Sequence, residues 1–264
     1  MSIAGANVPN MGWLSGIVDG VRTWWSRRRP GDTPDTLGPG LATVEELIER
    51  MRAIDRELGP EDGVRAFNHM YLRVTELVRD RVTDGYFTNP AFLARLDLRF
   101  AGLYLGALLA PVPAAAWAPI LELRHTPGRL PIQYALAGMN AHINHDLPLA
   151  VVATCRELRL SPDSPGVYED YLRINELLAA AQEEVRQSFL DGLALEVDRA
   201  HTGPVANLVG AWSINRARDA AWTNANVLWR LDRLEPLRTD YAATLSRSVG
   251  LAGRLLLTPV DELA

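Results

Sequence analysis

The most restrictive feature of this sequence is an apolar run from Ile132 to Ala153 that is interrupted at its centre. A helix that is apolar on all sides is normally buried. Five polar side chains lie within seven residues of the run: Asn140, His142, Asn144, His145 and Asp146. A buried polar group without a partner costs about 2 kcal/mol or more, so protein, water or a ligand must satisfy each of them. We therefore predict a buried central helix that carries the functional site.

The spacing within this cluster places an imidazole next to a carboxylate. His142 and Asp146 are four residues apart and share one helix face, with His145 beside them. On one interpretation these three side chains are ligands of a single divalent metal ion, which would be zinc, iron or manganese. On the other, Asp146 holds His142 in one tautomer, and the pair is either a catalytic acid–base pair or a structural one. The sequence leaves these interpretations open.

A second pair at the same spacing, Asn140 and Asn144, lies on an adjacent face of the helix. These two amides are candidates for positioning a substrate. Pro148 disfavours helical geometry at Leu147 and has no N–H group to donate to the carbonyl of Asn144. We therefore expect a kink beside the polar cluster, which would make room for a ligand.

The composition limits the classes of function. Apolar residues make up 48% of the 264 residues and the net charge is −5, which is typical of a soluble globular protein and argues against nucleic-acid binding. All 27 basic side chains are arginine, so a lysine Schiff-base mechanism is excluded. Cys155 is the single cysteine and cannot form an internal disulfide. No stretch predicts a transmembrane helix or a signal peptide, so we expect a cytoplasmic protein, whose oligomeric state stays open.

Residues 1–40 differ in composition from the rest and are predicted to be a separate segment. Within residues 11–29, tryptophans and aliphatic residues recur at helical spacing and arginines interleave, as in a basic amphipathic helix. Such a helix either makes weak contact with an anionic membrane surface or packs on the protein. We favour packing, because the helix is short and Asp19 weakens its positive charge. A Pro/Gly-rich linker separates it from the main domain, residues 41–264.

The main domain has helical periodicity and no convincing strand. Thr43 and Glu46 form a capping box at the start of one helix, and Pro90 opens another. The inward stripe after Pro90 contains Tyr104, a candidate for contacting substrate, and also Asp97, which is out of place there. Asp97 is either a catalytic acid or base, a metal ligand, or the partner of a buried arginine. These patterns predict an all-α fold: one bundle of about seven or eight helices around a kinked, buried central helix.

A helix predicted from Val205 to about Leu234 has a face on which tryptophans alternate with amides and an acid. This face is either the wall of a ligand-filled groove or a packed face whose indole N–H groups donate to the polar residues. Arg218 can stack on Trp222, four residues later, and pair with an anionic group. Both residues are therefore candidates for binding substrate.

Several short motifs can be compared with known families. They are Phe67-Asn68-x-x-Tyr71-Leu72-x-x-Thr75, Asp97-x-x-Phe100-Ala101-x-x-Tyr104, Gly138 to Pro148 (GMNAHINHDLP), Tyr171 to Asn175, and Arg218 to Trp222. Together they resemble an uncharacterised family of all-helical proteins that is common in actinobacteria. The family has no established activity, so the resemblance implies the fold and not the reaction.

A second resemblance concerns the central motif alone. His142-x-x-x-Asp146 followed by Leu147-Pro148 is similar to a helix of the zinc-dependent phospholipase C and single-strand nuclease superfamily. That motif continues to a further histidine, where this chain has Ala150, and the second His-x-x-x-Glu helix of the superfamily is absent. A three-zinc site of that kind cannot be assembled here, and at most one metal ion could be held.

These observations predict a small-molecule enzyme with an interior pocket around the central cluster. It would catalyse hydrolysis or a proton-transfer rearrangement, with or without a metal ion. His142 would be the general base or a metal ligand, Asp146 its orienting partner or co-ligand, and Asp97 a second acid–base group or ligand. The residues expected to contact substrate are Asn140, Asn144, Arg218, Trp222 and Tyr104. The alternatives are a non-catalytic binding protein for an apolar metabolite or lipid, and a protein associated with a membrane surface.

Overall fold

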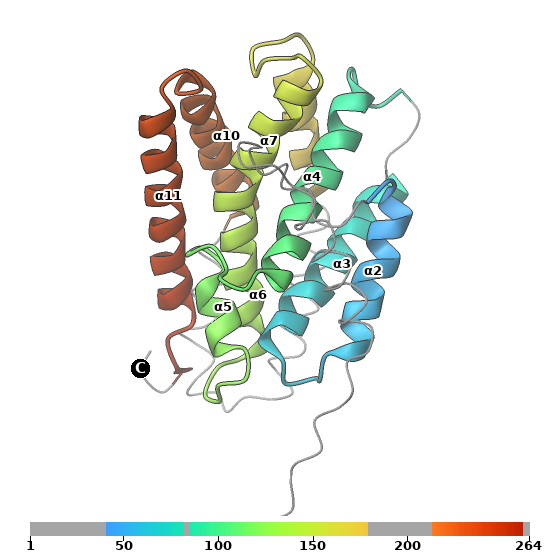
Figure 1. Ribbon diagram of the computed structural model, residues 1–264. Helices are drawn as coiled ribbons and strands as arrows, with labels where there is room; N and C mark the ends of the chain where they lie inside the picture. Colours follow the sequence, from blue (N-terminus) through green and yellow to red (C-terminus); the bar gives the residue numbers. More distant parts are fainter. Residues whose placement is uncertain (1–40, 82–84, 179–212, 261–264) are drawn as a thin grey trace, which may run out of the picture.

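The computed structural model describes residues 41–81, 85–178 and 213–260, and all regular structure in these ranges is helical (Figure 1). The outer helices of the bundle are α2 (Val44–Glu57), α3 (Gly63–Arg81), α4 (Pro90–Leu109), α5 (Ala118–Leu123), α10 (Ile214–Arg230) and α11 (Glu235–Leu256). Residues 167–178 are also helical. The predicted all-α bundle is confirmed. The amphipathic segment and its membrane contact fall outside the described residues.

A central helix runs through the middle of the bundle (Figure 1). It consists of α6 (Pro131–Ala141), the π-helical turn η1 (His142–Asp146) and α7 (Leu147–Glu157), which follow one another without a break. Helix α6 contacts α3 and α11, whereas α7 contacts α4 and α10. Most of its side chains are buried, as the apolar run predicted.

Beside Pro148, where a kink was expected, the structure has the π-helical turn η1. The N–H group of Leu147 donates to the carbonyl of His142, five residues earlier, in place of a partner four residues earlier. Pro148 follows at once and has no N–H group to restore the α-helical pattern in that turn. Single π-helical turns of this kind occur frequently at functional sites.

Local capping groups fix where the helices begin. The Thr43 hydroxyl accepts a hydrogen bond from the N–H of Glu46, whose carboxylate accepts one from the N–H of Ala42, at 3.1 and 2.7 Å. Asn89 caps α4 immediately before Pro90, as expected for a helix that begins with proline. Gln133 at the start of α6 donates to the carbonyls of Leu256 and Thr258 and so joins α6 to the end of α11.

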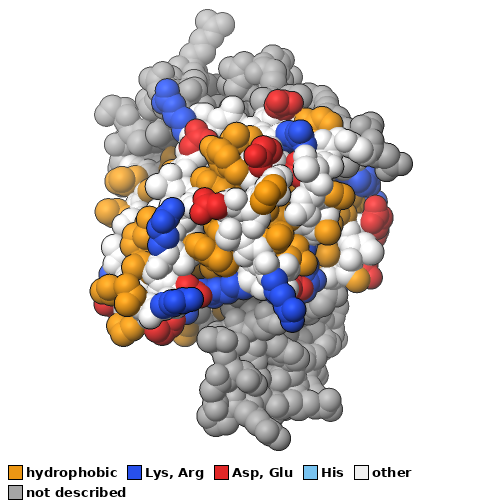
Figure 2. Space-filling model, turned by 90° about the horizontal axis from the view of Figure 1, so that it is seen from above, with side chains coloured by type: hydrophobic (Ala, Val, Ile, Leu, Met, Phe, Trp, Pro, Cys, Tyr) orange, Lys and Arg blue, Asp and Glu red, His pale blue; other side chains and the backbone are white. Residues whose placement is uncertain are grey.

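Two hydrophobic cores lie along the central helix. One is formed mainly by α2, α3, α6 and the second half of α4, and the other by the first half of α4, α7, α10 and residues 167–174. Met139 on α6 packs against both. On the face seen from above, arginine and acidic side chains are scattered among apolar ones (Figure 2). Within the described residues, no helix is both long enough and apolar enough to span a membrane.

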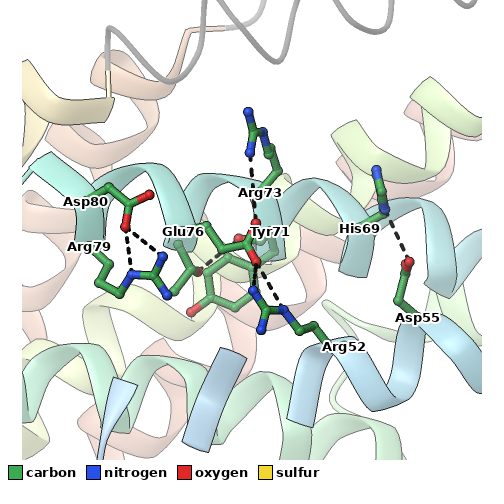
Figure 3. A network of polar contacts seen from close by, with 9 residues as sticks. Arg52, Asp55, His69, Tyr71, Arg73, Glu76, Arg79 and Asp80 are labelled. Carbon is green, nitrogen blue, oxygen red and sulfur yellow. Dashed lines mark hydrogen bonds and ion pairs between the residues drawn. The ribbon is translucent and has the colours of Figure 1, made fainter. Parts of the chain in front are cut away.

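Ion pairs join α2 to α3 at the surface (Figure 3). Arg52 on α2 contacts Glu49 on its own helix and Glu76 on α3, each at 2.7 Å, and Glu76 also faces Arg73. His69 is 68% exposed at its side chain and faces Asp55. These exposed pairs add little stability, so packing must hold α3 in place.

Gly138 allows α6 to lie close against α3. A Cβ atom at this position would lie 2.3 Å from the ring of Phe67. We expect Gly138→Ala to lower the free energy of unfolding by about 2 kcal/mol, because it forces two packed helices apart. Gly106→Ala is the matched control: its added methyl group would meet nothing within 4 Å, so we expect about 0.5 kcal/mol of stabilisation. Urea denaturation measures both, and equal effects would contradict the close-packing explanation.

Candidate functional site

The carboxylate of Asp146 is the centre of a buried hydrogen-bond network. Its Oδ2 atom accepts from His142 Nδ1 and from the indole Nε1 of Trp117, both at 3.0 Å. Its Oδ1 atom lies 2.7 Å from His145 Nδ1. Asp146 is 1% exposed and His142 is 2% exposed. An ionised carboxylate can only accept hydrogen bonds, so the Nδ1 atoms of both histidines carry protons.

These contacts set the charge states of the pair. Burial by itself raises the pKa of Asp146, but the hydrogen bonds that His142 and His145 donate to its carboxylate outweigh it and hold the pKa below its usual value. Burial lowers the pKa of His142 by more than the hydrogen bond and charge of Asp146 raise it. At neutral pH, Asp146 is therefore ionised and His142 is neutral, with its free electron pair on Nε2.

The π-helical turn explains how both histidines reach one carboxylate. In a regular α-helix, residues that are adjacent in sequence point in clearly different directions, so His145 and Asp146 would diverge. A π-helical turn holds more residues per turn, so successive side chains diverge less. Since the turn spans His142 to Asp146, it allows His142 and His145 to approach the carboxylate from two sides.

Five aromatic rings surround the imidazole of His142. Phe100 on α4 stacks on it with a centroid distance of 3.5 Å and an interplanar angle of 6°. Tyr71 on α3 follows at 4.7 Å. The remaining three rings lie between 5.8 and 6.1 Å away: Phe67, Tyr104 and Trp117. The site therefore lies where α3, α4 and the start of α5 meet η1.

Two buried polar atoms at this site have no hydrogen-bond partner within the described part of the chain. They are Nε2 of His142 and the hydroxyl oxygen of Tyr71. Burial raises the pKa of Tyr71 well above its usual value, and the negative charge of Asp97 adds to that shift. Buried polar groups are normally satisfied, so two adjacent exceptions indicate a position where a ligand can bind.

Asp97 lies on α4 one turn before Phe100 and has no hydrogen bond or ion pair with a described residue. Two arginines on the same helix, Arg95 and Arg99, pair with Glu157 instead. Burial raises the pKa of Asp97 to about 6. No arginine in the described part of the chain is therefore the partner of Asp97. Its carboxyl group is suited to exchange a proton near neutral pH.

The amides predicted to position a substrate are bound within the protein. The side chain of Asn140 donates to the carbonyl of Val249 on α11 at 2.9 Å and accepts from Asn144 at 3.1 Å. Tyr104 donates through its hydroxyl group to Asn68, which donates in turn to the carbonyl of Met51. These side chains hold α6 against α11 and α4 against α2 and α3.

Arg218 and Trp222 lie in a different cluster. The guanidinium of Arg218 packs on the ring of Tyr171, and Trp222 packs on Tyr168 and Tyr171. No described residue takes part in both this cluster and the ring of aromatic residues around His142. The structure thus brings His142, His145, Asp146, Tyr104 and Asp97 together, and it places Arg218 and Trp222 elsewhere.

The geometry favours Asp146 as an orienting group over a metal ligand. Both of its oxygens receive hydrogen bonds from protonated imidazole nitrogens, which a metal ion would have to replace. Within the described residues, no three His, Cys, Asp or Glu side chains are arranged to hold a metal ion.

Sequence reasoning missed three side chains of the site. Trp117 was not among the predicted site residues, yet its indole donates to Asp146. Tyr71 and Phe100 appeared only within the motifs of the family resemblance. The signal for Trp117 was its own chemistry, since a buried indole N–H normally needs an acceptor. The other two offered no signal, because only packing places them against His142.

Comparison with known proteins gives one match. A model described as a family of unknown function, DUF5995, matches residues 44–259, a range that includes every residue of the site. No curated protein and no solved structure matches the chain.

Proposed function

Since this chain belongs to the DUF5995 family of unknown function, an activity must be argued from its site, and we propose a small-molecule enzyme that uses His142 as general base. The observation that carries the proposal is the difference between the two nitrogens of one imidazole. Nδ1 is held by Asp146, whereas Nε2 is buried without a partner among the described residues. An oriented imidazole with a free Nε2 is the arrangement that general-base catalysis requires.

The neighbouring groups support a proton-transfer reaction. When Nε2 takes a proton from the substrate, the carboxylate of Asp146 stabilises the imidazolium that forms. Tyr71 can donate a hydrogen bond to the oxygen on which negative charge develops. Asp97, with a pKa of about 6, can return a proton. Base, donor and acid are thus supplied from η1, α3 and α4.

The reaction class follows from the absence of a nucleophile at Nε2. No serine, threonine or cysteine of the described residues forms a hydrogen bond with that atom. The proton removed by His142 would therefore come from the substrate itself or from water, which gives a rearrangement or a hydrolysis without an acyl-enzyme. The surrounding rings favour a substrate with an apolar body, and the carboxylates disfavour an anionic one.

The first test needs no substrate. Nitrogen-15 NMR of the histidines is expected to show His142 neutral at pH 7, protonated at Nδ1 and unprotonated at Nε2. Asp146→Asn should disturb this tautomer, because an amide can also donate to Nδ1. The exposed His69 serves as the control, because its signals should be the same in both proteins. If His142 carries its proton on Nε2 instead, the proposal is contradicted.

The second test concerns turnover. The protein should be assayed against uncharged hydroxy-ketones, lactones and simple esters, with His142→Gln and His69→Gln in parallel. Loss of an essential general base costs about 100-fold or more in rate. We expect His142→Gln to abolish turnover and His69→Gln to leave it unchanged. Equal rates in the two variants would assign the activity to another site.

A further inference from the structure

Arg218 on α10 is a buried cation that forms no ion pair with a described residue. It is 5% exposed, and no described aspartate or glutamate lies within ion-pair distance of it. Its Nε atom donates to the side chain of Asn175, and Nη2 donates to the carbonyl of Tyr171 at 2.9 Å. The guanidinium carbon lies 4.2 Å from the centroid of the Tyr171 ring. These neutral contacts fix the orientation of the guanidinium but leave its charge uncompensated.

Other arginines next to buried groups do form ion pairs. Arg99 is buried to a similar degree and pairs with Glu157, and the partly exposed Arg124 pairs with the buried Asp62 at 2.5 Å. Burying a charge is costly unless it is paired, so such pairing is the usual solution. Burial lowers the pKa of Arg218 by more than Tyr171 and Asp219 raise it. Among the described residues, Arg218 is therefore an enclosed guanidinium that lacks an ion-pair partner.

One edge of this guanidinium is left for a ligand. Hydrogen bonds occupy Nε and Nη2, and no described residue accepts from Nη1. An anion bound at Nη1 would leave the contacts to Asn175 and Tyr171 in place.

An aromatic surface lies beside the guanidinium. Trp222 packs against Tyr171 and Tyr168 with centroid distances of 4.6 and 4.8 Å. Tyr168 is 42% exposed, which is unusual for a large ring in this bundle, and Trp222 is partly exposed. Tyr171 is held from the other side by its hydroxyl group, which donates to the carbonyl of Arg218 at 2.7 Å. A flat group can stack here while a group attached to it reaches the guanidinium.

We propose that Arg218, Tyr168 and Trp222 form a binding site for a small aromatic anion, namely a carboxylate or phosphate attached to a flat ring. The guanidinium supplies charge and directed N–H donors, which suit carboxylate and phosphate oxygens. Tyr168 and Trp222 supply the stacking surface. The site is separate from the His142 cluster and does not depend on the proposed catalytic role of His142.

The test uses the full chain with benzoate and phenyl phosphate as probes, titrated by calorimetry. Phenol and inorganic phosphate are the comparison arms, because each retains only one half of the recognised chemistry. We expect saturable binding of both probes and at least about tenfold weaker binding of phenol and phosphate. Arg218→Met and Trp222→Leu should each weaken probe binding by at least about tenfold. Arg216→Gln, an exposed arginine two residues away on the same helix, should bind as the unaltered protein does.

Several results would overturn this proposal. The first is a lack of saturable binding of either probe. The second is probe binding that neither Arg218→Met nor Trp222→Leu weakens. The third is probe binding that Arg216→Gln weakens as much as Arg218→Met does. If Arg218→Met does not fold, probe binding is measured with Trp222→Leu and Tyr168→Ala instead, since both variants retain the guanidinium. His142→Gln should leave probe binding unchanged, so failure here and failure of the proposed catalysis are distinguishable.

Discussion

His142→Ala is expected to lower the free energy of unfolding by about 3 kcal/mol or more. The substitution removes one of three donors to a buried carboxylate and leaves its charge less compensated. It also removes the ring on which Phe100 stacks. Thermal and urea denaturation measure the effect. His125→Ala is the control, because that side chain is 71% exposed and its loss should change stability by about 0.5 kcal/mol at most.

The double variant His142→Ala with Asp146→Leu separates a structural pair from a functional one. If the pair is structural, the second substitution should recover only part of the loss, because Trp117 and His145 then lack their acceptor. If the cluster is a catalytic site, turnover should also vanish in the double variant, because the general base is gone. If the double variant melts well below the unaltered protein and keeps full activity, the cluster has a purely structural role.

Asp97→Asn is expected to stabilise the protein at pH 7 and to have almost no effect at pH 3.5. The pKa of Asp97 is about 6 in the folded protein, compared with an ordinary value of 3.8. Between these values the folded state binds more protons than the unfolded state, so the free energy of unfolding falls as pH rises. A shift of about 2 units corresponds to about 3 kcal/mol. This is an upper limit, because the residue as a whole is partly exposed.

Denaturation at a series of pH values between 3.5 and 7 tests this expectation. The gain from Asp97→Asn should grow through the window from about pH 4 to about pH 6 and then stay constant. Asp240→Asn, at an exposed position on α11, should show no such trend. If Asp97 also returns a proton to the substrate, the stabilised variant should lose turnover. A loss of stability at pH 7 would instead mean that Asp97 has a favourable partner.

The sequence by itself determined the architecture and the location of the polar cluster. Helical periodicity and capping residues act within a few positions of the chain, so Thr43, Pro90 and the apolar run from Ile132 could be interpreted without knowing the fold. The His142–Asp146 contact was predictable for the same reason, because residues four apart meet on any helix. The family match over residues 44–259 agrees with the resemblance that the motifs carried.

Only the tertiary structure decided what these residues do together. The indole of Trp117 reaches Asp146 from a separate segment, 29 residues away, and Phe100 reaches His142 from α4. Spacing along one helix cannot reveal such contacts, because the packing of whole helices sets them. The same holds for Arg218, which periodicity allowed near the central cluster and packing placed on Tyr171. Burial is also a property of the assembled bundle, and it is burial that raises the pKa of Asp97 and lowers that of His142.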